Sequence, residues 1–314
     1  MAASDRQQPI LHHFDMSPFS EKIRLIFGRK GIGWRSVVIP MVLPKPDYVA
    51  LTGGYRRTPA LQIGAEVFCD TLLIADEIER RWPAPTLYPD GRAGHHKALA
   101  FWAETNLFWP AARLAVGVNA EALPQEFHDD RAAMFGLRPP TPESLARSAE
   151  RAREQVLPQV EWVARMLNGN AGAGGYLLGA APGLADIAVY HCLWFLDVLP
   201  RKLLGEVVTS DALRGWMARI AGIGHAARSE MGAGEAIDEA AASGGALPAD
   251  GPIDDGSFIA GQEVTVSPVD RASPPVTGGL ALLNASQVAV RRRDPRAGEV
   301  LVHFPRLGYR VSKA

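Results

Sequence analysis

A serine followed by a proline, Ser17 and Pro18, is the first place in this chain where the residue types suit chemistry. Serine often caps a helix, and proline suits the first helical position because the amide proton it lacks would be unpaired there. The unpaired amides at a helix start favour negative charge, and a nearby hydroxyl can donate a hydrogen bond to an anion. Ser17 is therefore a candidate anion-stabilising group. Its simpler role is a helix cap contributing about 1 kcal/mol.

Cysteine and histidine offer little further chemistry. The chain has two cysteines, Cys69 and Cys192, too few for a disulfide framework or a structural zinc cluster. Cys69 is best interpreted as a small buried residue at the end of a strand. His12 and His13 have no companion ligands in the sequence, so we expect no metal.

The elements that would position Ser17 lie in residues 1–90, where strand and helix patterns alternate as in an α/β unit. The segments with strand character are residues 10–14, 34–39, 60–63 and 66–68. One helix should begin at Ser17, and Asp70 should cap another that runs to about Trp82. The predicted order is β α β, then β β α.

Residues 91–232 have a helical pattern. Four aromatic residues recur seven apart in pairs and so share one side of a helix: Phe101, Trp102, Phe108 and Trp109. Pro110 predicts a kink there. Apolar residues at steps of three and four predict a long helix from residue 142, and the apolar stretch 184–199 predicts a helix buried on all sides.

The composition changes again near residue 233. Residues 233–256 are rich in Gly, Ala, Asp and Ser, which favours a linker. Residues 257–314 then hold short alternating segments separated by turn signals, which predicts a small β-barrel or sheet.

Charge and hydropathy exclude several classes of protein. Lys plus Arg number 33 and Asp plus Glu 34, so there is no overall attraction to nucleic acid or to an anionic membrane. Residues 287–314 carry seven positive side chains against two carboxylates, which favours a solvated edge strand over a nucleic-acid surface. The longest apolar stretch is too short to span a membrane, and the polar N-terminus does not resemble a secretion signal. We therefore expect a cytoplasmic protein.

The order of elements resembles the glutathione transferase superfamily over residues 9–230. Residues 17–20 lie where thioredoxin-fold relatives carry their redox pair, and residues 57–61 look like the family's segment with a cis-proline. Residues 70–71 match its acidic-plus-hydroxyl pair. Residues 184–187 resemble its folding motif, although Gly183 stands where a serine or threonine is usual. We expect Asp186 to cap the buried helix and to take no part in catalysis.

This resemblance implies that Ser17 stabilises the thiolate of glutathione, the co-substrate. The reference thiol pKa is about 8.5, and lowering it by two units takes about 2.7 kcal/mol of preferential stabilisation of the anion. Neither Ser17 nor Ser20 is a cysteine, so disulfide exchange by the chain itself is not expected.

The resemblance also implies a glutathione-binding set. Thr58, ahead of a cis Pro59, would pair with the cysteinyl backbone, and Arg57 would bind the glycyl carboxylate. Asp70 and Thr71 would bind the γ-glutamyl end. The alternatives are a solvated arginine at position 57 and a plain helix cap at position 70.

An apolar electrophile would then lie between the first two domains, against Phe19, Phe101 and Trp109. Most such aromatic stripes are packing, so one or two of these residues would touch it.

The predicted architecture has three parts: a thioredoxin-like α/β domain (1–90), an all-helical glutathione-transferase-like domain (91–232) and, after the linker, a small all-β domain (257–314). The predicted function is a glutathione transferase that activates the thiol for conjugation to, or isomerisation of, a small apolar electrophile. The resemblance implies a homodimer, although the extra domain could obstruct it. The alternative is a non-catalytic interaction protein in which the β domain is the docking unit.

Overall fold

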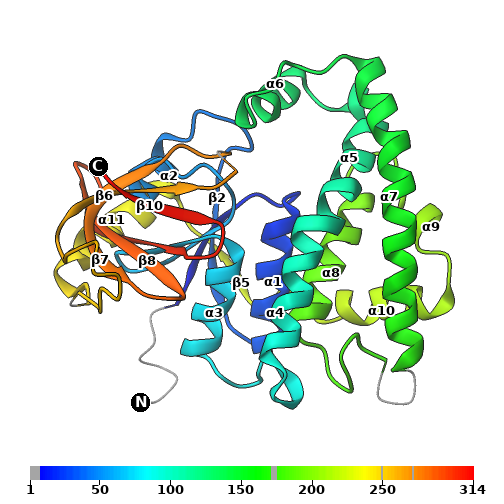
Figure 1. Ribbon diagram of the computed structural model, residues 1–314, viewed down its shortest axis with the longest axis horizontal. Helices are drawn as coiled ribbons and strands as arrows, with labels where there is room; N and C mark the ends of the chain where they lie inside the picture. The colour runs from blue at the N-terminus through cyan, green and yellow to red at the C-terminus, as the bar shows by residue number, and fades with distance from the viewer. Residues whose placement is uncertain (1–7, 171–174, 249, 271) are drawn as a thin grey trace.

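The computed structural model describes residues 8–170, 175–248, 250–270 and 272–314. One ten-stranded sheet runs through the molecule in the order β10-β6-β7-β8-β9-β4-β3-β1-β2-β5, with the helical domain beside it (Figure 1). The strands are β1 (Ile10–His13), β2 (Trp34–Val38), β3 (Ala60–Ile63), β4 (Glu66–Cys69), β5 (Arg228–Glu230), β6 (Glu263–Pro268), β7 (Val276–Leu283), β8 (Gln287–Asp294), β9 (Gly298–Pro305) and β10 (Tyr309–Lys313). The helices are α1 (Pro18–Lys30), α2 (Pro46–Thr52), α3 (Thr71–Arg81), α4 (Ala93–Trp102), α5 (Phe108–Val118), α6 (Gln125–Met134), α7 (Pro142–Gly169), α8 (Leu184–Trp194), α9 (Leu204–Val207), α10 (Asp211–Ala221) and α11 (Ala233–Ser243).

The first domain has the predicted thioredoxin-like order with one addition, the short helix α2 between β2 and β3, where the sequence predicted only a loop. β1 pairs in parallel with β2 and antiparallel with β3, and β3 forms a hairpin with β4. Ser17 caps α1 by accepting a hydrogen bond from the amide of Ser20, and Gly31 ends the helix with φ of 64°. That left-handed conformation favours glycine. The apolar face of α1 is buried, including Ile23, Ile26 and Phe27, and it packs against α8 of the helical domain.

The helical domain forms as predicted, with one irregularity. A π-helical turn, Ala103–Leu107, joins α4 to α5. Pro110 explains its position, because proline lacks an amide proton and its ring clashes with the carbonyl one turn earlier. The irregular turn therefore takes up the kink predicted at Pro110. Within the described residues, no helix is both long and apolar enough to cross a membrane.

Helix α8 is buried along almost its whole length and depends on Asp186 for its start. The Asp186 carboxylate accepts hydrogen bonds from the amides of Gly183 (3.1 Å) and Leu177 (2.9 Å) and from the Trp216 indole (2.9 Å). A side chain at position 183 would collide with the ring of His96, which explains the glycine there. Asp186 therefore has the expected structural role.

The predicted linker contains a helix. α11 occupies its first part, and Ala236, Ile237 and Ala240 are buried on one of its faces. The carboxylate of Glu235 accepts a hydrogen bond from the amide of Gly232 (2.6 Å) and so caps the helix. The small side chains that suggested flexibility let α11 pack closely against α2 and β9.

The C-terminal strands form a sheet and extend that of the first domain. β6 to β10 pair antiparallel among themselves, and β9 pairs in parallel with β4, with Val67 opposite Val302. The ring of His303 stacks on Phe68 with centroids 4.4 Å apart. We call residues 257–314 the C-terminal module. The C-terminal module therefore joins the first domain through the pairing of β9 with β4.

Two buried histidines on β1 make the fold sensitive to acid. Burial lowers the pKa of His12 to about 4, against a hydrogen bond with Gln62 (2.7 Å) that raises it. Burial and the nearby Arg24 lower the pKa of His13 to about 3. Both imidazoles are therefore neutral at pH 7, and unfolding releases them to bind protons more readily.

We expect the free energy of unfolding to fall between pH 7 and pH 5, because the unfolded chain takes up protons below its own histidine pKa of about 6.5 and the folded chain does not. His12 alone should contribute about 2 kcal/mol of this loss. Urea unfolding at both pH values measures it. His12→Asn should remove that part of the pH dependence, and His95→Asn, at an exposed position, should not. An undiminished pH dependence in His12→Asn would contradict the assignment.

Candidate functional site

Four sequence-predicted residues lie at one end of the first domain's sheet. His12 pairs with Ala60, and Ala60 pairs with Cys69. The last residues of β1, the first residues of β3 and the last residues of β4 therefore lie at the same end of the sheet. The residues at this edge are Ser17, Thr58, Pro59 and Asp70. The topology therefore brings the predicted site together.

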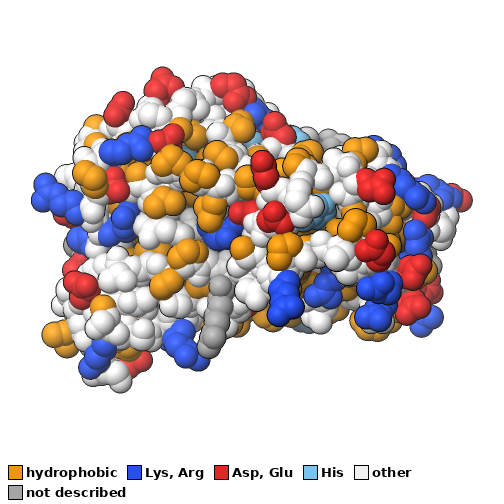
Figure 2. All heavy atoms as spheres, turned by 90° about the horizontal axis from the view of Figure 1, so that it is seen from above, with side chains coloured by type: hydrophobic (Ala, Val, Ile, Leu, Met, Phe, Trp, Pro, Cys, Tyr) orange, Lys and Arg blue, Asp and Glu red, His pale blue; other side chains and the backbone are white. Residues whose placement is uncertain are grey.

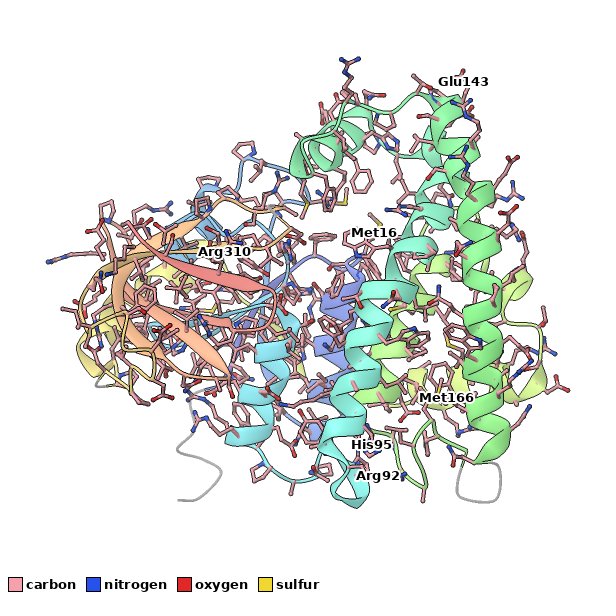
Figure 3. The ribbon with its side chains drawn as sticks, in the orientation of Figure 1. Met16, Arg92, His95, Glu143, Met166 and Arg310 are labelled. Carbon is pink, nitrogen blue, oxygen red and sulfur yellow. The ribbon has the colours of Figure 1, made fainter. Side chains whose placement is uncertain are left out.

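Ser17 is buried, with 3% of its surface exposed. Its Oγ accepts a hydrogen bond from the amide of Ser20 (3.2 Å), and its own amide donates to the carbonyl of Phe14 (3.0 Å). The cap role is therefore present, and no described residue accepts the hydroxyl proton, which leaves it for donation to a ligand. The neighbouring Met16 is exposed and lies at the end of α1 nearest α5 and α6 (Figure 3).

The bend before β3 is the second part of the edge. The Thr58–Pro59 peptide bond is cis. Among the described residues, none hydrogen bonds to the backbone amide or carbonyl of Thr58. Its Oγ1 accepts a hydrogen bond from Lys45 Nζ (3.4 Å), which also donates to the carbonyl of Arg56 (3.2 Å). The backbone of Thr58 is thus available to a ligand.

Lys45 is a site residue that the sequence did not single out. Burial, with Arg131 and Arg56 nearby, lowers the pKa of Lys45 to about 8. In the sequence, Lys45 stands between Pro44 and Pro46, and this pattern predicts only a loop. The ammonium therefore places positive charge beside the bend and loses that charge in mild alkali.

Arg57 and Asp70 both have partners in the C-terminal module. The Arg57 guanidinium pairs with Asp270. One carboxylate oxygen of Asp70 accepts a hydrogen bond from the amide of Leu72 (3.0 Å), and the other accepts one from the Tyr309 hydroxyl (3.2 Å). Burial raises the pKa of Asp70, against that amide bond, which lowers it. Asp70 is thus a helix cap, and a ligand would have to displace Tyr309 to reach its second oxygen.

Thr71 belongs to a buried charged cluster that the sequence did not predict. Its Oγ1 accepts a hydrogen bond from Lys22 Nζ (3.2 Å), and Lys22 forms an ion pair with Glu104 (2.5 Å). His191 lies 3.5 Å from the same carboxylate. Burial raises the pKa of Glu104, but Lys22 and His191 outweigh it and hold that pKa below its ordinary value. We call Lys22, Thr71, Glu104 and His191 the buried polar cluster.

The buried polar cluster links both domains, because its residues come from α1, α3, the π-helical turn and α8. A sequence signal existed: Lys22 lies three residues after Phe19 and four before Ile26, on the apolar side of α1. Lysine at such a position requires a buried partner, and only the fold shows which one.

The predicted aromatic wall exists in part. Phe19 packs on Phe108 with centroids 4.7 Å apart, Phe108 on Trp109 at 5.1 Å, and Trp109 on Phe135 of the turn after α6 at 5.4 Å. Phe101 is 44% exposed and has no ring contact with these residues in the described part of the chain. The wall therefore runs from α1 to α6 without Phe101.

The two cysteines are both buried, and burial raises the pKa of Cys69 and of Cys192 well above the ordinary value. Neither thiol is placed as a nucleophile. Across the described ranges, no cluster of three or more His, Cys, Asp or Glu side chains is placed to hold a metal.

A thioredoxin-like domain followed by a helical domain defines a class of two-domain proteins. Similarity to known families and structures identifies which family of this class the chain belongs to. The family model for the glutathione S-transferase N-terminal domain matches residues 11–89, and that for the C-terminal domain matches residues 146–219. A GST-like protein from Pseudomonas syringae is 37% identical, with a TM-score of 0.78 over 98% of this chain and 100% of that chain. The chain belongs to the glutathione S-transferase superfamily.

More distant structures match the fold alone. Glutathione transferase GSTFuA3 from Phanerochaete chrysosporium is 17% identical, with a TM-score of 0.56 over 70% of this chain and 98% of that chain. A glutathione S-transferase from Rhodospirillum rubrum F11 is 17% identical, with a TM-score of 0.51 over 68% of this chain and 87% of that chain. Matches to these two proteins leave about a third of this chain uncovered. The comparison with curated proteins finds no match.

We expect Glu104→Gln to destabilise the protein by about 3–5 kcal/mol, because it leaves the Lys22 ammonium buried without its counter-charge. Replacing both residues by methionine should recover most of that loss. Urea unfolding measures the three variants. The matched control is Glu161→Gln, which breaks the exposed pair with Arg165 and should cost about 0.5 kcal/mol or less. Equal costs for Glu104→Gln and Glu161→Gln would show that the buried pair is unimportant.

Proposed function

We propose that this protein binds glutathione and activates its thiol for attack on a small apolar electrophile. The observation that carries the proposal is the Ser17 hydroxyl at the start of α1, at the same sheet edge as the free backbone of Thr58. Glutathione would supply the nucleophilic sulfur. Ser17 would donate a hydrogen bond to the thiolate, and the amide end of α1 would add its favourable potential.

The bend supports binding of a peptide. The amide and carbonyl of Thr58 can pair with a peptide backbone as an added strand would. Lys45 and Arg57 supply positive charge nearby for a carboxylate. Thr71 and Asp70 would face the γ-glutamyl end, and this is the part of the site where Tyr309 already hydrogen bonds.

The second substrate would pack on the aromatic wall. Phe19 adjoins the start of α1, and Trp109 continues the wall toward α6. In conjugation, a carbon–sulfur bond forms and either a leaving group departs or the acceptor carbon chain takes up a proton.

A second candidate function is a non-catalytic interaction protein that keeps the fold. The specific observation in its favour is that Arg57 and Asp70 are already bonded to the C-terminal module. Calorimetric titration with glutathione separates the two candidates. Heat of binding together with thiolate absorbance at about 240 nm supports the transferase, and no heat at millimolar glutathione supports the interaction protein.

The proposal includes a cytoplasmic location and a homodimer. The edge of β4 is not available for strand pairing between two copies, because β9 pairs with it. A dimer would therefore form through another surface.

We expect Ser17→Ala to raise the pKa of the bound thiol by about one to two units, since a hydrogen bond to a charged group is worth about 1.5–3 kcal/mol. Thiolate absorbance of the complex as a function of pH measures it. Ser210→Ala is the matched control, because Ser210 caps α10 of the helical domain by the same type of bond (3.3 Å). An unchanged thiol titration in Ser17→Ala would assign the role to another group.

We expect Asp270→Asn to tighten glutathione binding about three- to tenfold, because it removes the carboxylate charge that competes with the ligand's carboxylate for the Arg57 guanidinium. Asparagine keeps the Oδ1 that accepts the amide of Ala272 (3.1 Å), so the local turn should persist. Calorimetry gives both affinities. The control is Asp254→Asn, at an exposed position of the segment leading into the C-terminal module. Weaker or unchanged binding in Asp270→Asn would exclude Arg57 as a ligand.

A further inference from the structure

A cleft of about 660 Å³ lies between α6 and the C-terminal module. Its volume is in the range of small-molecule sites. Met134 at the end of α6 forms one wall, and Ser267 of β6 with Arg310 and Ser312 of β10 form the opposite wall. Neither family model covers the residues of the second wall, so that wall is particular to chains that carry the module.

Arg310 is the charged group that the fold leaves available in this cleft. It lies on β10, on the side of the module nearest α6 (Figure 3). Within the described residues, its guanidinium has no hydrogen bond and no ion pair. Strand alternation places Arg310 and Ser312 on the cleft side of β10, whereas Tyr309 is buried and Lys313 points away from the cleft.

The surroundings of the cleft are positive. Arg56 lines the cleft and pairs with Asp130 (2.5 Å), and the same carboxylate also binds Arg131. The Lys45 ammonium donates a hydrogen bond to the backbone carbonyl of Arg56. Five positive side chains lie in or beside the lining against two carboxylates: Lys45, Arg56, Arg57, Arg131 and Arg310 against Asp130 and Asp270. The lowered pKa of Lys45, caused by burial and by Arg131 and Arg56, agrees with a positive local potential.

Seen from above, the molecule has acidic and basic side chains interspersed over its face (Figure 2). A general anion-binding surface is therefore not indicated. Arg310 is exposed, and what distinguishes it is that it lines the cleft without an ion pair to any described residue.

The cleft and the aromatic wall meet in the chain at the end of α6. Met134 lines the cleft, and the next residue, Phe135, packs on Trp109, which packs in turn on Phe108. An apolar body on that wall could therefore extend into the cleft and place a charged end near Arg310.

We propose that the electrophile is an organic anion with an apolar body, whose acidic group binds Arg310 in this cleft. The inference rests on the proposed function, since it names the chemical class of the second substrate. The hydroxyls of Ser267, Ser273 and Ser312 supply further hydrogen-bond donors to the acidic group. The module is then a specificity element.

The test uses the full chain without glutathione and two fluorescent probes of similar size. The anionic probe is 8-anilinonaphthalene-1-sulfonate, and the neutral probe is N-phenyl-1-naphthylamine. Arg310→Gln should weaken binding of the anionic probe about five- to tenfold at low ionic strength and leave the neutral probe unchanged. Ser312→Glu, on the same side of β10, should weaken the anionic probe as well.

Lys313→Gln is the matched control, because it removes the same charge from the other side of the same strand. Equal weakening by Arg310→Gln and Lys313→Gln, or no weakening by Arg310→Gln, overturns the proposal. Loss of both probes in Arg310→Gln also overturns it, because the arginine would then act on the fold. A failed glutathione titration would leave the probe result standing, so the two proposals fail separately.

Discussion

The parallel pairing of β4 with β9 is the constraint on which the rest of the structure depends. It fixes the C-terminal module against the first domain in one register, with Val67 opposite Val302. Because the module is held there, Tyr309 reaches Asp70 and Asp270 reaches Arg57. The same pairing satisfies a strand edge that would otherwise be open to other chains. The module is therefore part of the candidate site's wall as well as an extension of the sheet.

The buried polar cluster holds the other side of the site. Lys22 of α1 is bonded to Thr71 at the start of α3 and to Glu104 in the π-helical turn. A buried ion pair contributes little net stability, but it favours one arrangement because any other leaves a charge without a partner. The position of the Ser17 hydroxyl thus depends on contacts made by Lys22, a turn further along α1. Thr71 has this structural role as well as its proposed ligand role.

The two ends of the candidate site have different origins in the chain. In the proposed function, Ser17 and Thr58 would form the thiol end, and both lie within the residues that the family model for the N-terminal domain matches. The acceptor end would combine Trp109 of the helical domain with Arg310 of the module. Under the proposals above, such a division would let the chemistry of the thiol stay constant while the module changes what the thiol attacks.

The sequence by itself determined the thioredoxin-like and helical domains, since caps such as Ser17 and Asp186 and the apolar periodicity are local signals. It did not reveal α11, because its small side chains look like a linker until Ile237 has a sheet to pack against. Pairs such as Lys22 with Glu104 and Asp70 with Tyr309 were equally beyond it. Partners so distant in the chain leave no periodic pattern, and only the paired strands and the packed helices bring them within bonding distance.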